Sequence, residues 1–214
     1  IAPNGGEPSE IERTLAHEFV HVAQAGTGVF RNLPSQLPLD RRGTTDGSLA
    51  TRSIIEGAAV FGSTAYTERY QPSYPTELTT LARIYDNASA GTQLFWGPYR
   101  FGGAHVADRI DDPAALDEVY GDPPVTTEQV IHATDDPVRD LSVAVDPGAW
   151  TEVRRDSMGE LFTRVALDAA LSRDRAASAA AGWGNDRLVG FERADRRGYV
   201  WALRWDDATE ADAF

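Results

Sequence analysis

Apolar residues recur at helical spacing near the start of the chain. At 100° per residue, one arc holds Ile11, Leu15, Ala16, Phe19, Val22 and Ala23, and the opposite arc holds Thr14, His17, His21 and Gln24. This pattern predicts an amphipathic helix with its apolar side in the core and its imidazoles facing a cleft. Ser9 and Glu12 have the spacing of a capping box at its start, and Gly26 is a natural stop.

Further periodic segments predict a mainly helical α+β fold. Before residue 138 we expect a loop over 27–47, followed by helices over 48–71 and 76–88. A turn-rich stretch over 96–103 should then lead into a helix around His105, and short helices should follow over 113–119 and 126–132. After it we expect a strand within 138–150, helices over 158–167 and 173–181, and a β-hairpin of 188–192 with 199–205. This organisation divides the chain into a helical domain, 1–137, and a C-terminal α+β segment, 138–214.

The polar arc of the first helix contains the pattern His17-Glu18-x-x-His21. Residues four apart lie about one turn apart on one helix face, so both imidazoles can bind a single tetrahedral Zn²⁺ ion. The glutamate of this pattern serves as the base that takes a proton from metal-bound water. The alternative is a solvated histidine pair, which is less expected around a glutamate in a chain with only four histidines.

A catalytic zinc ion needs a third protein ligand, and cysteine is absent. Glu56 is the best candidate, because it lies in the apolar run of residues 54–61 and a lone buried carboxylate is costly unless it is paired or bound to a metal. Its neighbours Gly57, Ala58 and Ala59 are small, so a second helix can approach the first closely. The alternative is an ion pair between Glu56 and an arginine.

These motifs resemble the gluzincin metallopeptidases, in which two histidines and a downstream glutamate bind zinc. Residues 97–103 and 122–132 narrow the resemblance to proteins assigned as secreted metallopeptidases and to haloarchaeal surface proteins. The resemblance spans most of residues 10–132 and implies a zincin-like core. Two positions depart from the family pattern. Ala58 stands where the relatives often have an acidic residue, and Ala25-Gly26 replaces a polar pair after Gln24. Both departures bear on how the zinc-binding histidines would be oriented.

The resemblance also implies an additional tyrosine or histidine that stabilises the oxyanion formed during hydrolysis. His132, Tyr99 and Tyr66 are the candidates, and spacing does not choose among them. Zincins place a twisted sheet before the metal helix, whereas sixteen residues precede His17 here. We therefore expect the upstream sheet to be missing or to be supplied by another polypeptide or segment.

The charge of the chain indicates which kind of organism it comes from and which classes of partner it could bind. The chain has 33 acidic residues, 20 of them Asp, against 20 basic residues that are all Arg, and its net charge is −13. Such a surface is typical of adaptation to molar salt, and a haloarchaeal source is our leading inference. The acidity argues against a nucleic-acid partner, and no apolar run is long enough to span a bilayer. No calcium-binding loop of the EF-hand pattern is present.

The sequence thus predicts a zinc-dependent peptidase that hydrolyses peptide bonds with His17, His21 and Glu56 as ligands and Glu18 as the base. Its partner would be a peptide or protein substrate. The alternative is a non-catalytic, zinc-containing binding or structural protein at the cell surface of a halophile. The resemblance favours a location outside the cell or at its surface, while the acidic composition suits a halophile's cytoplasm equally well.

Overall fold

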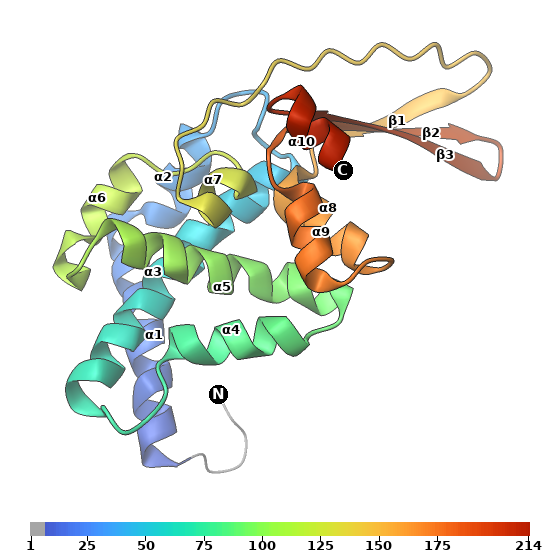
Figure 1. The fold of residues 1–214 in the computed structure, drawn as a ribbon. Helices are drawn as coiled ribbons and strands as arrows, with labels where there is room; N and C mark the ends of the chain where they lie inside the picture. Colours follow the sequence, from blue (N-terminus) through green and yellow to red (C-terminus); the bar gives the residue numbers. More distant parts are fainter. Residues whose placement is uncertain (1–6) are drawn as a thin grey trace.

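The longest helix, α3 (Thr45–Tyr70), runs through the helical body in the computed structural model, which describes residues 7–214 (Figure 1). The Thr44 side chain caps its first turn by accepting a hydrogen bond of 3.1 Å from the Gly47 amide. The predicted second helix is therefore present, and it begins three residues before the expected Ser48. Helices α1, α4 and α5 pack against it, so α3 positions most of the other elements.

Helix α5 (Ala90–Arg109) crosses α3 at very short range. A Cβ added to Gly57 would lie 2.3 Å from the backbone carbon of Gly102, and one added to Gly102 would lie 1.9 Å from the Ser53 oxygen. The prediction of turns over 96–103 was wrong, because these residues are helical and Pro98 lies inside α5. Their glycines permit the close crossing of two helices instead of breaking one.

The other helices surround this pair. They are α1 (Pro8–Thr27), α2 (Val29–Gln36), α4 (Glu77–Asn87), η1 (Pro113–Ala115), α6 (Leu116–Gly121) and α7 (Thr127–His132). Helix α2 lies within the stretch predicted to be a loop, and it contains Pro34. Its Val29 and Leu33 join a buried apolar cluster with Ile54, Phe61 and Val106, which accounts for its stability as a helix.

Helix α1 is oriented opposite to the prediction. Only His17 and Gln24 are buried among its residues, whereas four apolar side chains are 45 to 66% exposed: Ile11, Leu15, Phe19 and Val22. The polar arc faces α3, where Gly62 makes room for Val20. The expected capping box is also absent, because α1 begins at Pro8 and its N-cap residue, Glu7, makes no side-chain capping bond.

The C-terminal part adds a sheet at one end of the helical body (Figure 1). Its strands β1 (Thr151–Asp156), β2 (Trp183–Arg193) and β3 (Arg196–Trp205) pair antiparallel in the order β1-β2-β3, and they accompany α8 (Gly159–Asp168), α9 (Arg173–Ala180) and α10 (Ala208–Ala213). The mainly α, α+β fold class and the predicted hairpin are confirmed. The strand expected within 138–150 is instead an extended segment without pairing, and the first strand follows it.

A buried polar cluster joins this part to the helical body. Arg41 is 2% exposed and donates to Ser157 Oγ at 3.1 Å and to Asn185 Oδ1 at 2.9 Å. Asp186 is fully buried and accepts hydrogen bonds of 2.9 to 3.0 Å from the Met158 and Gly159 amides, at the start of α8. The Arg41 bonds therefore connect the helical body to the C-terminal part, and the Asp186 bonds fix the start of α8 against β2 within the C-terminal part.

Glu128 adds an acidic group to the same region and yields a prediction about pH. Burial and the neighbouring carboxylates, Asp206 first among them, raise the pKa of Glu128 from 4.5 to about 8. The folded state therefore binds a proton that the unfolded state has released between these values, so stability falls as pH rises from about 4.5 to 8. Glu128→Gln should raise the free energy of unfolding by a few kcal/mol at pH 8 and much less at pH 4.5.

Urea denaturation at both pH values measures this effect. Glu118→Gln, at an exposed position of α6, serves as the control and should change neither midpoint. Equal stabilisation by Glu128→Gln at the two pH values would contradict a raised pKa for Glu128.

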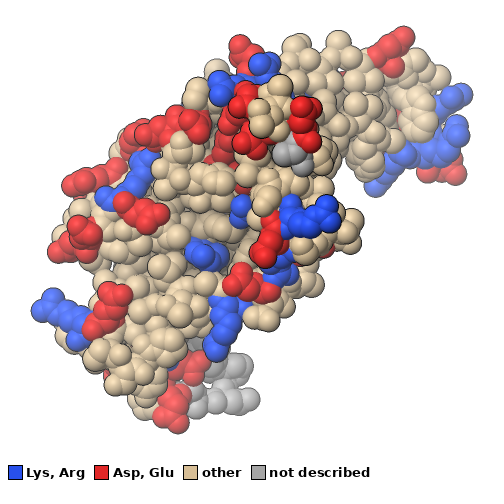
Figure 2. Space-filling view, in the orientation of Figure 1, with Lys and Arg blue, Asp and Glu red and all other residues tan. Residues whose placement is uncertain are grey.

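The charges are unevenly distributed over the visible surface (Figure 2). Acidic side chains spread across the helical body, while arginines gather at the far end of the hairpin, where Arg193, Arg196 and Arg197 are exposed. None of the helices within residues 7–214 has the length and apolar character needed to cross a membrane.

Candidate metal centre

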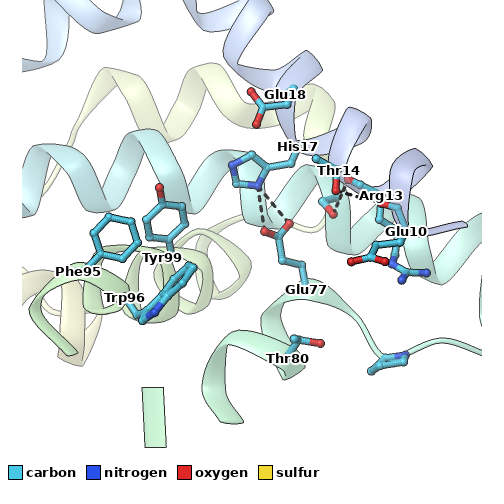
Figure 3. A pocket seen from close by; sticks show the side chains of 12 residues that line it. Glu10, Arg13, Thr14, His17, Glu18, Glu77, Thr80, Phe95, Trp96 and Tyr99 are labelled. Carbon is cyan, nitrogen blue, oxygen red and sulfur yellow. Dashed lines mark hydrogen bonds and ion pairs between the residues drawn. The ribbon is translucent and has the colours of Figure 1, made fainter. Parts of the chain in front are cut away.

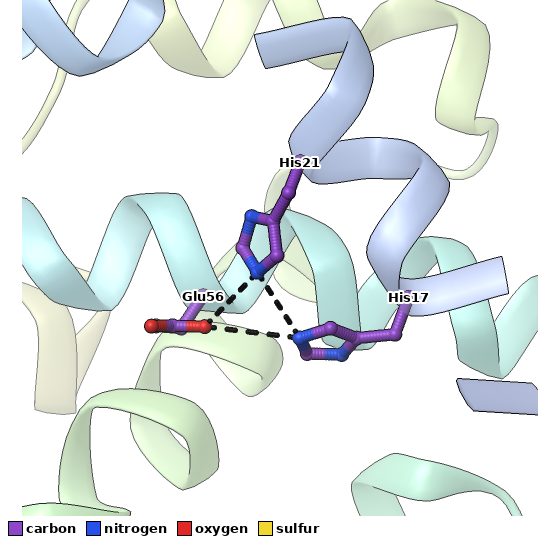
Figure 4. A group of neighbouring side chains, drawn as sticks. All are labelled: His17, His21 and Glu56. Carbon is purple, nitrogen blue, oxygen red and sulfur yellow. Dashed lines mark hydrogen bonds and ion pairs between the residues drawn. The ribbon is translucent and has the colours of Figure 1, made fainter. Parts of the chain in front are cut away.

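The structure brings together the three predicted ligands (Figure 4). His17 and His21 lie on the face of α1 that contacts α3, and Glu56 lies on α3 opposite them. His17 Nε2 is 3.2 Å from His21 Nε2 and 3.7 Å from Glu56 Oε2, and His21 Nε2 is 3.3 Å from the same oxygen. Within residues 7–214, this is the one cluster of three or more such residues whose ligand atoms converge within 4.8 Å.

This triangle has the size that a zinc ion needs. With bonds of about 2.0 to 2.1 Å, the ligand atoms of a tetrahedral zinc site lie about 3.3 to 3.4 Å apart. The three separations are close to that value, and two neutral imidazoles with one carboxylate are a common zinc ligand set. The residues present therefore fit the ion that the sequence motif implies.

Both imidazole rings are held by hydrogen bonds on their far side. His17 Nδ1 lies 3.1 Å from Glu77 Oε2, a carboxylate of α4, and His21 Nδ1 lies 2.7 Å from Gln24 Oε1. The Gln24 amide nitrogen donates to the Ile55 carbonyl at 2.9 Å, so its oxygen is left to accept from His21. Each Nδ1 thus carries a proton, and each Nε2 is directed to Glu56, where a metal ion could replace the Nε2 proton.

The electrostatics of the centre favour a cation. Although burial opposes the change, hydrogen bonds to Glu56 and Glu77 raise the pKa of His17 to about 9. Burial likewise opposes a low value for Glu56, yet its hydrogen bonds to His17, His21 and Tyr99 lower the pKa of Glu56 to about 2. A metal cation would satisfy the same carboxylate in place of the imidazole protons, so metal binding would release protons.

A cleft of about 440 Å³ opens beside the centre (Figure 3). Its lining includes His17 and Glu18 from α1, Glu77 from α4, and the α5 residues Trp96 and Tyr99. Glu18 is exposed and lines this cleft next to His17. The cleft is thus lined by one predicted ligand, His17, and by the predicted base, Glu18.

Tyr99 is the predicted oxyanion-stabilising residue that the structure places at the centre. Its ring stacks on His17 with 6.2 Å between centroids, and the Arg52 guanidinium carbon lies 5.3 Å from the centroid of the Tyr99 ring. Burial, together with the nearby Glu56, raises the pKa of the Tyr99 hydroxyl. The hydroxyl therefore stays protonated at neutral pH and can donate a hydrogen bond.

The structure does not bring His132 to the centre. This residue ends α7, and its Nε2 lies 2.9 and 3.0 Å from the two oxygens of the buried Glu160. Tyr66 is directed elsewhere as well, because its hydroxyl donates to Glu12 at 3.1 Å. His132 therefore takes part in an ion pair between α7 and α8, and we do not assign it an oxyanion role.

Sequence reasoning missed three residues around the centre: Gln24, Glu77 and Arg52. Gln24 follows His21 by three residues on the same helix face, so its spacing could have revealed the contact. Arg52 also had a signal, because it lies four residues before Glu56 on the same helix and is 3.7 Å from its carboxylate. Glu77 gave none, since its contact depends on how α4 packs.

Comparison with known proteins bears on a different part of the chain. One family, described as a domain of unknown function (DUF8575), matches residues 146–214, which hold β1 to α10. No curated protein and no solved structure matches the chain. The matched segment does not contain His17, His21 or Glu56, so the candidate metal centre rests on its own geometry.

Proposed function

We propose that this protein is a zinc-dependent peptidase. The observation that carries the proposal is the triangle of His17, His21 and Glu56 beside a cleft that Glu18 lines. A bound zinc ion would polarise a peptide carbonyl and make a water molecule acidic enough to attack near neutral pH. We further propose, from the family resemblance alone, that the protein acts outside the cell or at its surface.

The chain's own residues supply the remaining chemistry. Glu18 would accept the proton of the attacking water and pass it to the leaving amine. The Tyr99 hydroxyl would donate a hydrogen bond to the oxygen that becomes negative in the transition state. Glu77 and Gln24 would hold the two imidazoles in the tautomer that leaves Nε2 free for the metal.

A second candidate function is a non-catalytic protein in which the metal fastens α1 to α3. The specific observation in its favour is that α1 leaves four of its large apolar side chains 45 to 66% exposed, while only His17 and Gln24 are buried. A metal bridging the two helices would then supply much of their attachment. In this case Glu18 would have no chemical role, although the ligands would be the same.

Metal content tests the centre that both candidates share. Purified protein should hold about one zinc ion per chain, and His21→Ala should lose it, because two ligands bind zinc far more weakly than three. A strong chelator should lower the melting temperature of the intact protein by several degrees and leave His21→Ala unchanged. Mass spectrometry and thermal scans provide the two measurements.

The matched control is His132→Gln, which removes another histidine but keeps a hydrogen-bond donor for Glu160. It should retain zinc at the level of the unmodified chain. If His21→Ala held as much zinc as the control, the assigned ligands would be incorrect. A peptidase assay on the zinc-loaded protein then separates the enzyme from the non-catalytic candidate.

A further inference from the structure

A second hollow reaches the candidate metal centre from the side of Glu56. This groove of about 750 Å³ lies between α2, the segment that follows it and α3. Its apolar lining includes Phe30, Leu37 and Ile55, and three arginines, Arg31, Arg42 and Arg52, also line it. We call it the arginine groove. Glu56 is its single acidic lining residue, and that carboxylate is directed to the two histidines.

The charge of this groove is unusual for the chain. The protein carries 33 acidic against 20 basic residues, yet the lining holds three arginines and one glutamate. The cleft on the other side of the centre has the opposite balance, with Glu10, Glu18 and Glu77 against Arg13. The candidate metal centre therefore lies between an acidic cleft and the basic arginine groove. A polypeptide bound across the centre would contact both.

The arginines differ in how far the protein already uses them. Arg42 donates to the backbone carbonyls of Ser35 and Leu37, so it stabilises the wall of the groove. Arg52 lies 3.7 Å from Glu56 and stacks 4.8 Å from the Phe95 ring, which places its guanidinium at the junction of the two hollows.

Arg31 has a different status. It is exposed, and its guanidinium forms neither a hydrogen bond nor an ion pair with any residue from 7 to 214, while its backbone amide donates to Gly28. A guanidinium that lines a groove without a partner can bind a carboxylate of a ligand.

We infer that the arginine groove binds an acidic stretch of the substrate polypeptide, with aspartate or glutamate side chains on the part of the substrate that lies beyond Glu56. The inference rests on the proposed peptidase function and specifies its substrate class. An acidic peptide fits because carboxylates complement the guanidinium groups while the apolar lining accommodates the peptide's aliphatic atoms. A nucleic acid fits poorly, since its phosphates would meet a protein of net charge −13 outside this groove.

The test separates binding from cleavage. Isothermal titration calorimetry would measure the affinity of two peptides of equal length for the zinc-loaded Glu18→Gln protein. One peptide carries three aspartates in one half, and the other carries asparagines at the same three positions. The buffer would hold the lowest salt at which circular dichroism shows the folded protein, because salt screens exposed ion pairs. The acidic peptide should bind about fivefold more tightly than the amide peptide, as a few partly exposed ion pairs would provide.

Arg31→Gln should remove about half of that preference and leave the affinity for the amide peptide unchanged. The matched control, Arg83→Gln, removes an exposed arginine of α4 outside the groove and should preserve the preference. Equal affinities for the two peptides, binding of neither peptide, or an Arg31→Gln variant that keeps the full preference would each overturn the inference.

A cleavage assay with the unmodified, zinc-loaded protein distinguishes failure of the acidic-substrate inference from failure of the proposed peptidase function. Cleavage of both peptides at equal rates, with equal affinities, would remove the acidic preference and leave the peptidase. Tight binding of the acidic peptide without cleavage of either would leave the arginine groove as a binding site and remove the peptidase.

Discussion

Glu18→Gln is expected to abolish peptide hydrolysis while the zinc content stays unchanged. Glutamine has nearly the same shape as glutamate but cannot accept the proton of the attacking water, and loss of a positioned general base costs about 10²- to 10⁴-fold in rate. The zinc content should persist because Glu18 lies outside the triangle formed by His17, His21 and Glu56. The effect should appear in kcat, with little change in KM.

Three measurements on each protein check this result: zinc per chain, the melting temperature and the rate on a fluorogenic peptide mixture. Glu12→Gln is the control, because it removes a carboxylate of the same helix that contacts Tyr66 and Gln71 and does not line the cleft. If Glu18→Gln cleaved peptides at the rate of the control, Glu18 would not be the base. A zinc-loaded but inactive unmodified protein would favour the non-catalytic candidate.

Gly102→Ala is expected to destabilise the whole fold, by about 3 kcal/mol or more. The new methyl group would lie 1.9 Å from the backbone oxygen of Ser53, so α3 and α5 would have to move apart. Backbone atoms cannot shift as a flexible side chain can, and the displacement would disturb the apolar cluster that includes Ile54 and Val106. For a domain of this size, a loss of that order lowers the melting temperature by about 10 °C.

Gly91→Ala supplies a control of the same chemical change in the same helix. A Cβ at Gly91 would meet no atom within 4 Å, so alanine there should be neutral or stabilise by up to about 1 kcal/mol through its better helix propensity. Chemical denaturation of the two variants measures both values. Equal stabilities would mean that the crossing at Gly102 is looser than the structure shows.

The local part of the candidate site was predictable from sequence, because helix geometry alone places His17 and His21 on one face. Glu56 followed from a different argument, the cost of burying a carboxylate among apolar residues. The hydrogen bonds that hold the imidazole rings from their far side could not all be predicted in this way. Glu77 lies sixty residues from His17 and reaches it only because α4 packs where it does, and neither helix pattern carries that information.

Patterns were misleading where small residues or polar contacts decided the packing. Gly97, Gly102 and Gly103 suggested turns, yet they lie inside α5 and allow it to approach α3 and α8. The apolar arc of α1 suggested burial, yet the described structure buries the polar arc, since His17 and Gln24 bond to α4 and α3. Amphipathic periodicity identifies two faces of a helix, but it does not determine which of them the fold covers.

The way α1 is attached has a consequence for the lifetime of the protein. A helix that is held largely by polar contacts, among them those of His17, Gln24 and Arg13, and that leaves much of its apolar side in solvent, can separate from α3 more readily than the helices of the core. If the proposed zinc ion joins α1 to α3, its loss would open residues 8–27 first, and their amide hydrogens would exchange with solvent while the rest of the body stayed protected. Proteases cut such opened segments preferentially, so under this proposal the supply of metal would also determine how long each molecule survives.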